Sequence, residues 1–200
     1  MSTIRAALTH EATRTSAEWV FVDLGFAQNA KSCGLLVGDG KPRDLSFSEL
    51  QAFLVSLVTS GSESLNLLLE APLSVSFGVN GNPTGRSVER RDGKSRYWYV
   101  GLGCSVLVAA TYLLRAIHDA QPSREIRLFE GLVSFKSKGV RSSHSNDVLN
   151  LRNVIWESNS SLGRVVPAEE LAASEGDHVK SAFVVSGMNF GVPPVVAVGG

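Results

Sequence analysis

The chain has 200 residues, of which 44% are hydrophobic and 19% are charged, with equal numbers of basic and acidic side chains. This composition excludes an intrinsically disordered chain and favours one compact domain with a sizeable core. The zero net charge excludes a histone-like protein and a protein with a long acidic tail. The longest apolar runs, at 65–69 and 106–110, are far shorter than the roughly 18 residues that a membrane span needs.

The N-terminal residues 1–17 are polar and carry no continuous apolar stretch. They predict a flexible N-terminal segment rather than a secretory signal, so we expect a cytoplasmic protein. The two cysteines, Cys33 and Cys104, lie in apolar surroundings without a Cys-x-x-Cys or Cys/His cluster. This pattern favours small buried thiols over a disulfide or a zinc site.

Residues 19–22, Trp-Val-Phe-Val, are β-branched and aromatic without alternation, which is typical of a central strand buried on both faces. Strands near 32–37 and 43–47 follow after short turns and predict an antiparallel meander. Ser48 and Gln51 form a capping-box pattern ahead of a helix with apolar residues at helical spacing. A buried strand at 65–69 then implies a right-handed parallel crossover.

The second half alternates exposed segments with regular elements. Residues 78–96 read as an exposed loop, 99–117 as a long helix, 125–129 as a strand and 146–156 as a weak helix. A last helix is expected from Pro167 to about Val185, either continuous or interrupted at Gly176, before a Gly/Pro tail at 191–200. The order predicts one α/β domain over 18–190, a mixed five-stranded sheet with helices on both faces.

Three predicted buried strands end in a carboxylate, namely Asp23, Glu70 and Glu130. If these strands are parallel neighbours, their carboxyl ends meet at one edge of the sheet. Three like charges there repel one another unless a cation or a proton lies between them, and oxygen ligands suit Mg²⁺ or Mn²⁺. The alternative for each residue is that it caps a helix or pairs with an arginine.

Four short segments, at 22–25, 68–73, 86–90 and 127–130, carry a resemblance to a known superfamily. Together with the strand order, they resemble the ribonuclease H-like fold, which includes metal-dependent nucleases, resolvases and transposases. The segment 68–73, Leu-Leu-Glu-Ala-Pro-Leu, is similar to an uncharacterised branch of predicted nucleases that carries an acidic residue before Ala-Pro-Leu. The resemblance extends over about residues 19–186.

The resemblance implies that Asp23 bridges two Mg²⁺ or Mn²⁺ ions, that Glu70 holds one of them, and that Asp177 on the terminal helix is the last ligand. The chain departs from the pattern at Lys180, where such helices often carry a second acid. The site could therefore hold one metal, or keep binding without hydrolysis. Asp147 is a substitute for the last ligand.

Two basic loops flank the expected acidic centre and offer contacts to the phosphates of a nucleic acid. Their lysines and arginines are Arg86, Arg90, Arg91, Lys94 and Arg96 in the first loop, and Lys136, Lys138, Arg141 and Arg152 in the second. The alternative is that both loops are simply solvated.

These observations lead to the hypothesis of a metal-dependent nuclease that hydrolyses phosphodiester bonds in DNA or RNA. A catalytically inactive binding or assembly module is the alternative, motivated by Lys180 and by the hydrophobic tail, which could dock on a second copy or another protein. A phosphotransferase related to actin-like ATPases is disfavoured, because such enzymes need two copies of the fold. His144 near Asp147, and His178 beside Asp177, could assist a metal or a proton transfer or be ordinary polar residues.

Overall fold

The computed structural model describes residues 3–25, 30–91, 94–95, 98, 102–133, 143–157 and 161–199. A large mixed sheet forms its centre, with the strand order β11-β13-β10-β5-β2-β3-β4 and with β1 also paired to β10. Its strands are β1 (Ile4–Ala6), β2 (Glu18–Leu24), β3 (Cys33–Val37), β4 (Arg43–Leu45), β5 (Leu65–Glu70), β10 (Ile126–Leu132), β11 (Gly163–Val166) and β13 (Val195–Val198).

The meander and the parallel crossover are both present. Strands β2, β3 and β4 are antiparallel neighbours, whereas β2, β5 and β10 run parallel side by side. Within the described residues the sheet has eight strands rather than the five expected, because β1, β11 and β13 extend it beyond β10. The mixed α/β class is therefore confirmed and the strand number is corrected.

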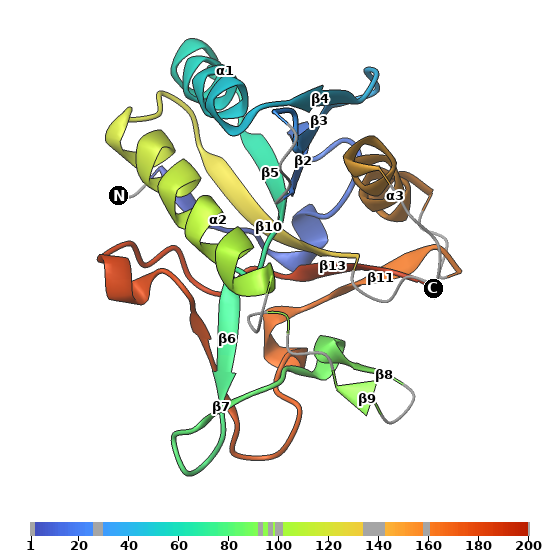
Figure 1. The fold of residues 1–200 in the computed structure, drawn as a ribbon, viewed down its shortest axis with the longest axis vertical. Coiled ribbons are helices and arrows are strands. Elements are labelled where there is room, and N and C mark those ends of the chain that lie inside the picture. Colours follow the sequence, from blue (N-terminus) through green and yellow to red (C-terminus); the bar gives the residue numbers. More distant parts are fainter. Residues whose placement is uncertain are drawn as a thin grey trace.

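Three α-helices of the described residues cover the two faces of the sheet (Figure 1). Helices α1 (Phe47–Ser60) and α2 (Leu102–Asp119) pack on one face, and α3 (His144–Glu157) packs on the other. The capping box of α1 uses Ser46 and Glu49, two residues before the predicted pair, and the Ser46 side chain accepts a hydrogen bond from the Glu49 amide. None of the described helices is long and apolar enough to cross a membrane.

Both chain ends differ from the prediction. The N-terminal segment contributes β1, which pairs with the first half of β10, and the short helix η1 (Thr9–Glu11). Arg5 and Glu11 fix this segment through an ion pair of 2.6 Å. Strand β13 in the Gly/Pro tail pairs with the second half of β10, because 195–198 is a β-branched apolar run that fills the remaining edge.

The predicted last helix is absent. Residues 167–185 instead form the short helix η3 (Ala168–Glu170), strand β12 (His178–Ser181) and the start of the short helix η4 (Val184–Ser186). Gly176 has a φ of 81°, which stops a helix from running through this segment. Strand β12 pairs with β6 (Ser74–Phe77), which also pairs with β7 (Pro83–Thr84). The remaining elements are η2 (Ser87–Glu89), β8 (Arg90–Arg91) and β9 (Lys94–Ser95).

The two cysteines are both free, but only one is buried as predicted: Cys33 lies in the core and Cys104 is exposed on α2. Burial raises the pKa of the Cys33 thiol to about 11, so it carries almost no thiolate at pH 8.

We expect one equivalent of a thiol reagent to react rapidly with the native protein, at Cys104, and a second only in denaturant. Mass spectrometry of the alkylated peptides checks this, and rapid native labelling of Cys33 would contradict the described packing of β3.

Candidate metal centre

Two of the predicted carboxylates face each other across the β2–β5 ladder. Asp23 pairs in register with Glu70, at the end where both strands stop. Side chains alternate between the faces of a sheet, so Asp23 lies on the same face as Phe21, which packs under α3. Glu70 shares that face with Leu68 by the same alternation. The parallel register therefore brings these two acids together, as the strand ends predicted.

The third carboxylate comes from the first turn of α3. The Ser143 hydroxyl accepts a hydrogen bond from the Asn146 amide and so caps this helix. Val148, Leu151 and Ile155 bury its inner side against the sheet. This packing sets the amino end of α3 over the carboxyl end of β2, and Asp147 is almost fully buried there.

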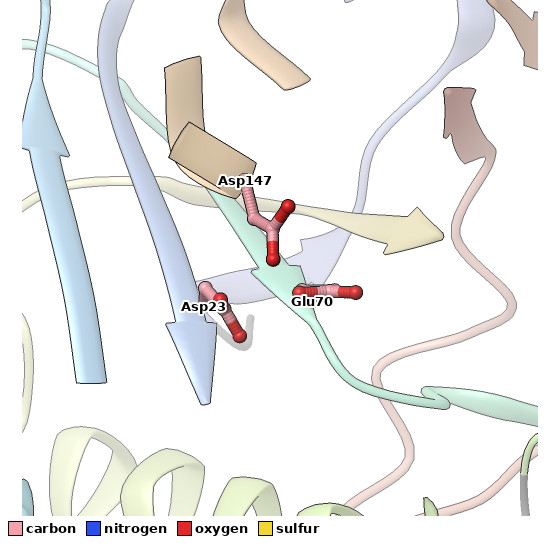
Figure 2. A group of neighbouring side chains, drawn as sticks. All are labelled: Asp23, Glu70 and Asp147. Atoms are coloured by element: carbon pink, nitrogen blue, oxygen red, sulfur yellow. The ribbon is translucent and has the colours of Figure 1, made fainter. Parts of the chain in front are cut away.

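One side-chain oxygen from each of Asp23, Glu70 and Asp147 lies within 4.8 Å of the others. Figure 2 shows the three side chains converging from β2, β5 and α3. Carboxylates gathered this closely repel one another, and a hard divalent cation relieves the repulsion. The donor set contains only oxygen, which suits Mg²⁺ or Mn²⁺ better than Zn²⁺ or Cu²⁺. The residues present therefore fit a divalent ion of this type.

His144 belongs to the same site. Its Nδ1 lies 2.7 Å from the Asp23 Oδ2 atom, and the hydrogen bond to this carboxylate raises the pKa of the imidazole. Two glycines leave room for His144 because they have no side chain. A Cβ atom at Gly34 would lie 2.6 Å from the His144 carbonyl oxygen, and one at Gly25 would overlap the His144 ring. The histidine therefore holds the Asp23 carboxylate, and the two glycines allow α3 to lie close to the sheet.

The other two predicted acids lie elsewhere. Glu130 pairs in register with Leu69, so it points to the face of α1 and α2, opposite the cluster. It is fully buried against Arg86, which lies 2.7 Å away. Asp177 lies in the turn before β12, where its carboxylate accepts a hydrogen bond from the Ser174 amide. Asp147, the substitute ligand, completes the cluster instead of Asp177.

The basic residues are only partly described. Arg86 is fully buried in an ion network and cannot contact a nucleic acid in this conformation, whereas Arg90 is exposed. Arg152 is half-buried on α3, where it donates a hydrogen bond to Asn153. For Arg91 and Lys94 only the backbone is described, in β8 and β9, and the predicted phosphate contacts at Arg96, Lys136, Lys138 and Arg141 lie outside the described residues.

Sequence reasoning ranked Asp147 below Asp177 and treated His144 as an ordinary polar residue or a helper. The signal that identifies both is the spacing of His144 and Asp147, which are three residues apart and share one face of a helix. Comparison of the chain with protein-family models, curated proteins and solved structures finds no match.

Neutralising one of the clustered carboxylates is expected to stabilise the metal-free protein. We expect Glu70→Gln to raise the melting temperature in EDTA by about 2–4 °C, since relief of about 1 kcal/mol of repulsion has this effect in a domain of this size. The same change should remove most of the stabilisation by Mg²⁺. Thermal denaturation with and without Mg²⁺ measures both effects. Glu63→Gln, at an exposed acid, is the control, and equal behaviour of the two variants would contradict the prediction.

The close approach of α3 to β3 can be tested at Gly34. The methyl group of Gly34→Ala meets the His144 backbone, so the start of the helix has to shift and move Asp147 with it. We expect a loss of about 1–3 kcal/mol of unfolding free energy and weaker Mn²⁺ binding. Gly78→Ala is the control, because a Cβ there makes only ordinary or slightly tight contacts. Wild-type stability and Mn²⁺ affinity in Gly34→Ala would show that the helix is not held at this point.

Proposed function

We propose that the chain is a metal-dependent nuclease of ribonuclease H-like fold, which hydrolyses phosphodiester bonds in DNA or RNA. The observation that carries the proposal is the convergence of Asp23, Glu70 and Asp147 at the carboxyl ends of parallel strands. The neighbouring strands β4, β3, β2, β5 and β10 support it, because their order and directions agree with the arrangement that the resemblance implies.

The three carboxylates would hold the ion. When bound, a divalent ion lowers the pKa of a water molecule and neutralises charge on the phosphate oxygens. His144 orients Asp23, since its Nδ1 hydrogen-bonds the Oδ2 atom and fixes the rotamer of that ligand. The Ser143 cap stabilises the first turn of α3, the turn that carries Asp147. The role of the chain is therefore to keep three carboxylate oxygens in a fixed arrangement on β2, β5 and α3.

The alternative of an inactive binding module loses both of its original supports. Lys180 is not on a terminal helix but in β12, where its Nζ atom lies 5.5 Å from the centre of the Phe77 ring. Its position therefore says nothing about a missing ligand. Residues 195–198 of the tail are paired in the large sheet as β13, and so are already occupied within this chain.

Metal binding and nucleic-acid cleavage test the proposal together. We expect calorimetry to detect Mn²⁺ or Mg²⁺ binding to the wild type, and Asp23→Asn and Asp147→Asn to abolish it. A labelled panel of single-stranded, duplex and branched DNA and RNA should be cut by the wild type and at least about 100-fold more slowly by these variants.

Asp119→Asn is the matched control, because it removes an exposed acid from the far end of α2. Equal cutting by the wild type, Asp23→Asn and Asp147→Asn would trace the activity to a contaminant and reject the proposal. Ion binding without any cleavage of the panel would favour the inactive module.

A further inference from the structure

Residues 71–73 connect Glu70, the last residue of β5, to β6 (Figure 1). Strand β6 is the central strand of the three-stranded sheet β12-β6-β7. The Ala71 amide donates to the Leu69 carbonyl, and Pro72 has no amide hydrogen. The Leu73 amide donates to the Glu130 Oε2 atom at 2.9 Å, and the Leu73 carbonyl accepts from Ala182. A side chain from the neighbouring strand therefore supplies one of the three hydrogen bonds named for this segment just beyond Glu70.

Arg86 holds Glu130 in place and reaches the same segment directly. Its Nη1 atom lies 2.8 Å from Glu130 Oε2 and 2.7 Å from the Ser74 hydroxyl, and its Nη2 atom lies 2.7 Å from Glu130 Oε1. Ser74 is the first residue of β6. The guanidinium thus clamps two consecutive residues, Leu73 through Glu130 and Ser74 directly, within four positions of Glu70.

A third charged group completes the network. Glu89 lies 3.2 Å from Arg86, and it also accepts hydrogen bonds from the Arg86 and Trp98 amides. The side chains of Arg86, Glu89 and Glu130 are all fully buried. Burying three charged groups carries a large desolvation cost, and well-packed apolar residues usually serve stability as well or better. The network is therefore better explained by the geometry it imposes than by the stability it adds.

We propose that the buried Arg86–Glu130 pair is a positioning device for Glu70, which fixes the segment beyond β5 so that the Glu70 carboxylate stays directed at Asp23 and Asp147. This inference rests on the proposed metal centre and adds to it. Glu130 acts from the opposite face of the sheet, through the backbone, and does not contact the ion. Groups that hold a ligand in place commonly change metal affinity by about 10- to 100-fold when they are removed.

The test compares two replacements of Glu130. Glu130→Leu removes the acceptor of the Leu73 amide, and we expect it to weaken Mn²⁺ binding by about 10- to 100-fold in calorimetry. Glu130→Gln keeps an oxygen that can accept the Leu73 hydrogen bond, but its NH2 group faces the Arg86 Nη2 donor, so we expect a smaller loss of Mn²⁺ affinity than in Glu130→Leu, about 3- to 10-fold. Ser74→Ala removes one contact of Arg86 with little change in volume and should weaken Mn²⁺ binding by about 3- to 10-fold. It carries the test if Glu130→Leu does not fold.

Arg124→Leu is the control for loss of a buried arginine and of its ion pair with an exposed acid. Arg124 is buried and pairs with Glu18 at 2.8 Å, at the opposite end of β2 from the metal centre. We expect this variant to lower the melting temperature in EDTA while its Mn²⁺ affinity remains that of the wild type. Unchanged Mn²⁺ affinity in Ser74→Ala, and in Glu130→Leu where that variant folds, would overturn the positioning role and leave the metal centre intact. A wild type that binds neither Mn²⁺ nor Mg²⁺ would overturn both.

Discussion

The register between β2 and β5 is the constraint on which the candidate site depends. It sets Asp23 opposite Glu70 at the last pair of the ladder and directs both side chains to the face that α3 covers. A shift of one residue in either strand would move that carboxylate to the opposite face, because side chains alternate along a strand. The buried apolar residues of both strands hold the register, since such a shift would also move them to the wrong layer.

Much of this arrangement can be predicted from the sequence. The uninterrupted β-branched and aromatic run before Asp23, and the leucine run before Glu70, both indicate central strands that are buried on both faces. The segment between these two strands has apolar residues at helical spacing, which implies a helical crossover and therefore parallel strands. Parallel strands bring their carboxyl ends to one edge of the sheet. Because these signals are local and strong, the strands, the crossover and two of the three acids could be predicted.

Asp147, the third acid of the cluster, could not be predicted from the rule that carboxylates at the ends of parallel strands meet. The strand that carries Glu130 continues for two residues beyond it, so this acid is not at a strand end, and its parity directs it to the other face. At Asp177, the expected helix gives way to a short strand whose existence depends on pairing with β6, a contact about 100 positions away in the chain. Such long-range pairing leaves no periodic signal strong enough to compete with a helical interpretation. Asp147 is only a substitute in the sequence analysis, because the resemblance places the last ligand on the terminal helix. The helix that carries Asp147 has a weak apolar pattern, and packing on the sheet supplies the stability that this pattern does not indicate.

The carboxylates at this end of the sheet have different surroundings on its two faces. On the face of α3, the side-chain oxygens of three acids converge with His144 beside them, an arrangement that could hold a metal ion. On the face of α1 and α2, Glu130 is enclosed without solvent and has an arginine within the fold as its partner. Burial, and to a smaller extent Glu89, raises the pKa of the Glu130 carboxyl, and Arg86 opposes this rise by favouring the charged form. An acid paired permanently with an arginine inside the fold is poorly suited to hold an exchangeable ion, but it is well suited to fix backbone. Strand parity thus sends the carboxylates of neighbouring strands to opposite faces, where one lies in an acidic cluster and the other pairs with an arginine.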